Sequence, residues 1–104
     1  MTAIELTPAQ QARARELGNL LGAADHCDLW REPDGSSTLT ARDYFGVSDP
    51  IDTVTEEVGL AERAGFLVLE PYSTGGPGGS WRLSAAGEAA LAFYRARLNG
   101  EANR

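Results

Sequence analysis

The side chains best suited to chemistry stand together, because the only histidine and the only cysteine of the chain are the neighbours His26 and Cys27. Asp25 and Asp28 flank this pair. A structural or catalytic metal needs three or four protein ligands, and adjacent residues rarely converge on one ion. Catalysis by a Cys–His pair needs contact in space and an orienting partner. The sequence therefore predicts no metal, no cofactor and no enzymatic activity, and Cys27 is expected to be a small buried apolar residue.

A second chemical feature is the acidic segment 46–66, GVSDPIDTVTEEVGLAERAGF. It carries five acids against the single base Arg63, which leaves this segment at net −4. Several carboxylates close to a phosphate backbone repel it, and no counterion release rewards their approach. The segment is either the solvated face of a core helix or itself a binding site for a protein. Its acids are Asp49, Asp52, Glu56, Glu57 and Glu62.

The composition is that of one small globular domain covering residues 1–104, with 42% hydrophobic and 23% charged residues. No apolar run approaches the ~20 residues that cross a bilayer, and the N-terminus lacks the features of a signal peptide. A single cysteine suits a reducing cytosol. All nine basic residues are arginine, which suggests a GC-rich bacterial genome. A cytoplasmic bacterial protein without membrane contact is expected.

Two helices are predicted where a capping residue precedes a proline. Thr7–Pro8 joins an N-cap hydroxyl to a proline whose missing N–H costs nothing at a helix start, so a helix is expected over 9–24. Asp49–Pro50 repeats this signature and predicts a helix over 51–64. Both segments carry apolar residues at helical spacing.

The segment between these helices is expected to hold two short elements. Residues 25–38 are polar and rich in turn-forming residues, and a short strand is expected at their end, over 36–39. A short helix is then expected over 41–45, closed by Gly46 in the left-handed conformation that ends many helices.

A β-hairpin and a last helix are predicted for the C-terminal part. The apolar run 66–72 and the segment 81–84 indicate two strands, joined by the glycine-rich loop 73–80. Ser84 then caps a helix over 85–98, and residues 99–104 are expected to fray. The resulting order is helix, short strand, helix, helix, β-hairpin wing and C-terminal helix. This is a winged helix, an α+β fold that is mainly α.

Three segments resemble the winged helix-turn-helix superfamily of bacterial transcriptional regulators, especially its MarR-like and PadR-like families. They are LTARDYFGVS at 39–48, VGLAERAGFLVLEP at 58–71 and WRLSAAGEAAL at 81–91. The stretch 48–65 is slightly longer than usual in these families, the exposed helix face is acidic, and the first helix is short. These departures concern DNA binding more than the fold.

The resemblance implies a transcriptional regulator that binds double-stranded DNA. The helix near 51–63 would enter the major groove, and the wing 73–80 would lie against the backbone or the minor groove. Hydroxyl and guanidinium groups are the expected donors to phosphates and bases. The expected DNA contacts are Arg42, Ser48, Thr53, Thr55, Arg63, Ser73, Thr74, Ser80 and Arg82.

The last helix is expected to form a homodimer. Leu91, Phe93, Tyr94 and Leu98 give it an apolar surface, which would be buried against a symmetry mate in a two-fold dimer. The same surface can instead pack on the first helix of its own chain.

The alternative function is an acidic module for protein–protein interaction: an adaptor, an anti-regulator or a nucleic-acid mimic that does not bind DNA. The acids of segment 46–66 would then be the contact surface for a basic partner. The distribution of charge discriminates between the two functions. Acids merged into one patch favour a protein partner, whereas arginines gathered around the wing favour DNA.

Overall fold

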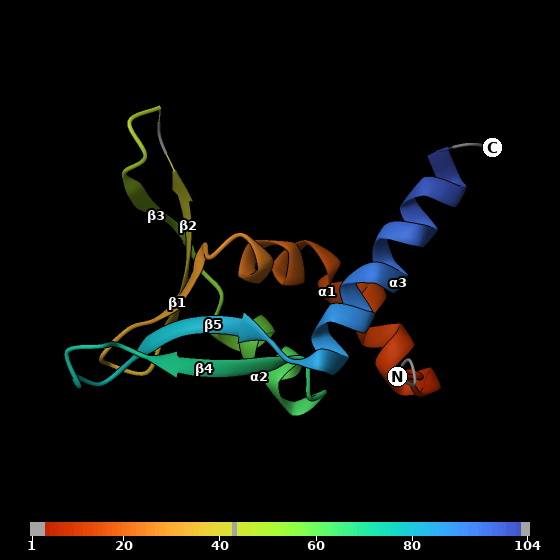
Figure 1. Cartoon of the computed structure of the whole chain (residues 1–104), viewed down its shortest axis with the longest axis horizontal. Helices are drawn as coiled ribbons and strands as arrows, with labels where there is room; N and C mark the ends of the chain where they lie inside the picture. Colours follow the sequence, from red (N-terminus) through yellow and green to blue (C-terminus); the bar gives the residue numbers. More distant parts are fainter. Residues whose placement is uncertain (1–3, 43, 103–104) are drawn as a thin grey trace.

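The computed structural model describes residues 4–42 and 44–102, apart from the side chains at 42, 48, 101 and 102 (Figure 1). These residues form helices and a sheet in an α+β arrangement. The elements in chain order are α1 (Pro8–Asp25), β1 (Leu29–Arg31), β2 (Ser37–Arg42), β3 (Ser48–Thr53), α2 (Thr55–Arg63), β4 (Leu67–Pro71), β5 (Gly79–Leu83) and α3 (Ala85–Ala102).

The strands form one antiparallel sheet in the order β3-β2-β1-β5-β4. The short strand β1 lies at its centre and joins two hairpins, β2–β3 on one side and β4–β5 on the other. Leu29 pairs with Leu39 of β2, and Trp30 pairs with Ser80 of β5. Because β1 is only three residues long, few backbone hydrogen bonds join the two hairpins through it. Side-chain contacts must therefore contribute to holding the hairpins together.

The core lies between one face of the sheet and the helices. Phe66, Leu21 and Leu29 are its largest fully buried side chains, and Trp81 of β5 joins them. Alternate residues of a strand point to opposite faces, so Trp30 and Arg82 lie on the other face, and the structure leaves Arg82 exposed. The whole buried cluster is Ala14, Leu17, Leu21, Ala24, Leu29, Val54, Val58, Ala61, Phe66, Leu67, Trp81, Ala90 and Leu91.

The first helix begins as expected from its sequence. The Thr7 hydroxyl accepts from the Gln10 N–H at 3.1 Å, and the Gln10 side chain accepts from the Thr7 N–H at 3.0 Å. This reciprocal capping box satisfies two donors that the first turn would leave unpaired. At the other end, the amide of Asp28 donates to the Ala23 carbonyl and Cys27 takes the left-handed φ of 62°. The helix therefore stops with a cysteine where glycine is usual.

The prediction of a winged helix was wrong, because the chain between α1 and α2 forms strands in place of helices. Residues 41–45, expected as a helix, continue β2 to Arg42 and then turn. Segment 48–53 is the strand β3, so Asp49–Pro50 does not start a helix. The left-handed Gly46, with φ 80°, lies in the connection between these strands. In addition, the expected polar connection 25–38 contains the central strand β1.

The physical reason is that the same local signals fit either element. Proline lacks an N–H, which suits the first turn of a helix and equally an edge strand that needs few donors. The β-branched residues of the segment, such as Thr38, Thr40 and Ile51, favour a strand. Helix α2 consequently begins at Thr55, later than the expected residue 51. The hairpin β4–β5 and the helix α3 lie where the sequence predicts a hairpin and a final helix.

The contact between α1 and α3 depends on Gly18. A Cβ placed on this glycine would lie 2.1 Å from Cγ of Tyr94, so the ring fills the space that a side chain would need. Tyr94 is held there by its hydroxyl, which donates to the Asn19 side chain at 3.0 Å. The two helices can therefore approach closely only where Gly18 faces the tyrosine.

We expect Gly18→Ala to lower the free energy of unfolding by roughly 1–3 kcal/mol, because overpacking displaces the Tyr94 ring. Gly22→Ala is the matched control in the same helix, since its Cβ would meet nothing within 4 Å. That control should stabilise the protein by up to about 1 kcal/mol through helix propensity. Urea unfolding followed by circular dichroism measures both. Equal effects of the two alanines would contradict the close packing at Gly18.

Candidate protein-binding arm

The hairpin of β2 and β3 projects from the body of the molecule. We call residues 37–53 the arm (Figure 1). Strand β3 is hydrogen-bonded to β2 alone, so it forms one edge of the sheet. The Cα radius of gyration is 14.3 Å, whereas a compact chain of this length would have about 13 Å. The arm and the C-terminal part of α3 both project from the body of the molecule (Figure 1).

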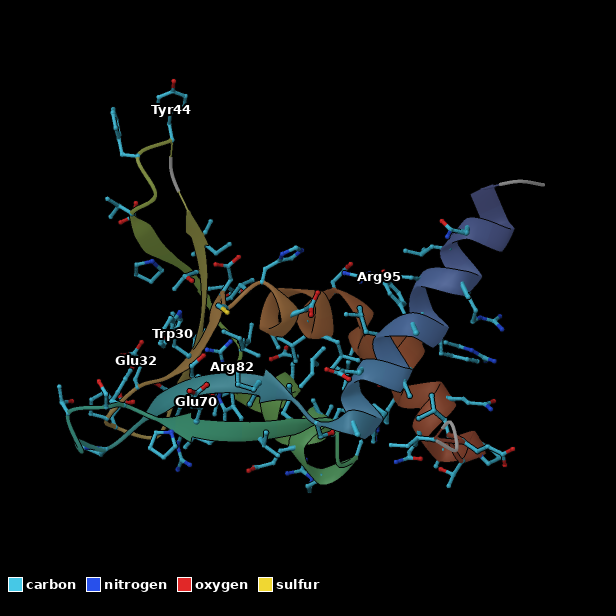
Figure 2. All side chains as sticks on the ribbon, viewed as in Figure 1. Trp30, Glu32, Tyr44, Glu70, Arg82 and Arg95 are labelled. Carbon is cyan, nitrogen blue, oxygen red and sulfur yellow. The ribbon has the colours of Figure 1, made fainter. Side chains whose placement is uncertain are left out.

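The tip of the arm is apolar and lies in solvent. Tyr44 is 96% exposed and Phe45 is 85% exposed, and Figure 2 shows Tyr44 pointing away from the body. Their rings meet edge to face with centroids 5.5 Å apart. Val47 beside them and Ile51 on β3 are also exposed. Grouped apolar side chains in solvent mark interaction sites more often than scattered single ones, and tyrosine is enriched among the residues that dominate binding energy.

The edge of β3 is not suited to pairing with another strand. The register between β2 and β3 shifts at Leu39/Thr40 and passes over Ile51, which leaves a bulge. Pro50 lacks a donor, and Asp49 and Asp52 place charges along the strand. Bulges, prolines and charges are the devices by which proteins prevent edge-to-edge aggregation. Addition of another strand at this edge is therefore disfavoured, and the groups that the arm leaves exposed are chiefly side chains.

The acids predicted from the sequence as a contact surface are all exposed. Asp49 and Asp52 lie on β3, Glu56 and Glu57 on the first turn of α2, and Glu62 near its end. Some of them also have local roles, because carboxylates in a first turn stabilise the helix dipole. The Asp52 side chain accepts from the Thr53 N–H at 2.9 Å. These five residues thus form the acidic flank of the arm and of the helix that follows it.

Ser37 fixes the base of the arm. Its hydroxyl is buried and accepts from the indole N–H of Trp81 at 3.0 Å. Its backbone N–H donates to the Thr55 hydroxyl at 3.0 Å, and its carbonyl accepts from the Val54 N–H at 2.8 Å. One residue therefore ties the arm to β5 and to the start of α2.

The residues expected to contact DNA do not form one surface. Thr55 is engaged with Ser37, and Thr53 lies on the exposed face of β3. Arg63 lies at the far end of α2, and Ser73 with Thr74 lies in the exposed turn between β4 and β5. The side chains of Arg42 and Ser48 lie outside the described residues.

Two further residues of that set are occupied or covered. Ser80 is only 6% exposed, and in this conformation its hydroxyl cannot reach a phosphate backbone. Arg82 is exposed but donates to a Glu70 carboxylate oxygen at 2.6 Å (Figure 2). Its guanidinium also contacts the Cys27 sulfur at 2.9 Å. The hydrogen bond to Glu70 is the largest of the effects that raise the pKa of Arg82.

The expectation of a buried Cys27 is only partly met, because this residue is half-buried and meets a guanidinium. The arginine donor comes from β5, far along the chain, and no local pattern in the sequence indicates this contact. Within the described part of the chain, no three His, Cys, Asp or Glu side chains gather where they could hold a metal ion.

The residues expected to form a dimer are mostly used inside the chain. Leu91 is in the core, and Tyr94 packs over Gly18. The Phe93 ring lies between two guanidiniums, with the Cζ atoms of Arg15 and Arg97 at 5.8 and 5.7 Å from its centroid. Of this expected set, Leu98 alone is exposed. The surface of α3 therefore packs chiefly on α1, which was the alternative to a dimer.

None of the described helices combines the length and apolar character needed to span a membrane. Comparisons with models of protein families, with curated proteins and with solved structures found no match to this chain.

We expect Ser37→Ala to lower the free energy of unfolding by roughly 1–3 kcal/mol, because it leaves the buried indole N–H of Trp81 without an acceptor. Ser36→Ala is the matched control one residue away. The Ser36 hydroxyl donates to Asp34 at 2.6 Å in an exposed turn and lowers the pKa of that carboxyl, so its loss should change stability little. Urea unfolding measures both variants. A Ser37→Ala protein as stable as the control would contradict the anchoring role of Ser37.

Proposed function

We propose that the chain is a protein-interaction module that binds, through its arm, a partner protein with a basic contact surface. The observation that carries this proposal is the exposure of Tyr44 and Phe45 at the tip of a projecting hairpin. Neither ring belongs to the buried core. A partner protein that covers the two rings would remove their apolar surface from water.

The chemistry of the arm defines the partner. Removing an apolar side chain such as Phe or Ile from water contributes roughly 1.5–3 kcal/mol, so the tip favours an apolar groove. The acids beside it favour a basic rim around that groove, because complementary charges speed association and exclude wrong partners. The partner is thus a protein with an apolar groove bordered by arginine or lysine.

DNA binding by a transcriptional regulator is the second candidate. Its support is the exposed glycine-rich turn between β4 and β5, where Ser73 and Thr74 can donate to phosphate oxygens. Against it stand the net charge of −6 and the acids on α2. Arg13 and Arg15 lie on α1, whose first residues are at the opposite end of the molecule from this turn (Figure 1). These two arginines therefore do not lie beside the wing.

The partner can be identified by photo-crosslinking from the tip. With p-benzoylphenylalanine in place of Tyr44, we expect one stoichiometric crosslinked protein after nuclease treatment. The same probe at Val68, exposed on the opposite edge strand β4, is the matched control and should give no such product. The protein identified by mass spectrometry is then purified and its affinity measured. The variant Tyr44→Ser/Phe45→Ser should weaken binding by about tenfold or more, as loss of central aromatic anchors does.

Equal crosslinking from positions 44 and 68, or unchanged affinity of the serine variant, would overturn the proposed role of the arm.

A gel shift separates the two candidates. Labelled duplex DNA from upstream of the coding sequence is titrated with the protein at low salt, where electrostatic attraction is strongest. We expect no retardation at micromolar protein, because the exposed face of α2 is acidic. Retardation that disappears with rising salt would support the regulator and count against a protein partner.

A further inference from the structure

A cleft on the opposite side of the molecule has the features that the arm requires of a partner. It lies between the start of α1 and the end of α2 and has a volume of about 420 Å³. Its apolar lining comes from Leu60, Ala64 and Ala9, and its only charged lining residues are Arg13 and Arg63. Gln10 closes one side, where its side-chain amide donates to the Ala64 carbonyl at 3.1 Å.

The charges of cleft and arm are opposite. The arm, residues 37–53, contains three aspartates and one arginine, a net charge of −2. The cleft lining contains two arginines and no acid. The Arg13 guanidinium forms an ion pair with the Glu16 carboxylate, with a nitrogen–oxygen distance of 2.8 Å. Arg63 has no ion pair with a described residue, and its guanidinium lies over Gly59. Arg63 is therefore the cation most available to an incoming carboxylate.

The size of the cleft suits the tip. Volumes of about 300–1,000 Å³ are typical of sites that hold compact apolar groups with a few placed polar partners. A tyrosine or phenylalanine ring can lie on Leu60 and Ala64 while an aspartate of β3 reaches Arg63. A second hollow on α2 shares Leu60 and Arg63 with the cleft and adds the acid Glu56 to its lining.

We infer that the arm of one copy docks into the α1–α2 cleft of a second copy of this chain. This inference rests on the proposed function, because it names the partner of the arm. In Figure 1 the tip of the arm lies at the top, whereas the first turns of α1 and the end of α2, whose residues line the cleft, lie at the bottom, so an arm cannot enter its own cleft. Since arm and cleft are different surfaces, the contact is heterologous and each added copy leaves one arm and one cleft open.

Self-association is measured by sedimentation velocity from about 1 µM to about 1 mM, the range in which weak contacts become populated. The wild-type protein should grow in mass with concentration and return toward monomer at high salt, which screens the arginine–aspartate attraction. The arm variant Tyr44→Ser/Phe45→Ser and the cleft variant Arg63→Glu should each associate roughly tenfold more weakly or not at all. All replaced side chains are exposed, so each variant should fold.

Arg97→Glu is the matched control. This arginine lines a different hollow, of about 210 Å³, together with Arg15, Tyr94 and Leu98. The control should associate like the wild type. Arg13→Glu provides a second cleft variant if Arg63→Glu fails to fold.

Mixing tests the pairing directly. The arm variant keeps an intact cleft, and the cleft variant keeps an intact arm, so an equimolar mixture should form a one-to-one pair that cannot grow further. A wild-type protein that stays monomeric over the whole range, a mixture that stays monomeric, or an Arg97→Glu effect equal to that of Arg63→Glu would overturn the inference.

The two proposals fail differently. If the chain is monomeric but crosslinks from Tyr44 to another purified protein and binds it in an arm-dependent way, the self-docking inference fails and the proposed function stands. If the arm variant changes neither self-association nor binding to any identified partner, both fail.

Discussion

The arrangement of the whole molecule depends on Ser37. Its side chain receives the buried indole N–H of Trp81, and its backbone holds Val54 and Thr55 at the start of α2. Because the central strand β1 is short, this set of hydrogen bonds supplies the connection between the two hairpins that backbone pairing alone leaves incomplete. A buried polar group is costly unless its partner is present, so the set holds one geometry in place of several.

With its base fixed in this way, the arm can project into solvent. The outer edge of β3 has no neighbour in the sheet, and its bulge, proline and aspartates keep other strands away from this open edge. What remains for contact is the aromatic tip. Glu56 and Glu57 have two effects, because they stabilise the first turn of α2 and also belong to the acidic flank beside the arm. Under the proposed function, stability and recognition would therefore use overlapping residues.

The sequence predicts the parts of the fold that rest on local chemistry. The Thr7–Pro8 start, the apolar run of β4 and the cap at Ser84 each predict an element that the structure contains. Asp49–Pro50 fits both a helix start and an edge strand, and the structure contains the strand. The separate prediction of a short helix over 41–45 included Tyr44 and Phe45, so the sequence did not indicate an exposed hairpin tip. The run of alternating β-branched residues at 38–40 was the signal that could have indicated a strand.

The sequence by itself determined the charge of the acidic flank, the two long helices, the hairpin β4–β5 and the rarity of reactive side chains. These properties depend on residue type and short-range spacing, so they do not depend on contacts between residues that are distant in sequence. Only the tertiary structure decided that residues 37–53 form an arm, that Ser80 is buried and that Arg13 and Arg63 line one cleft. Such features depend on contacts between residues distant in sequence, and their energy exists only when the sheet and helices have assembled.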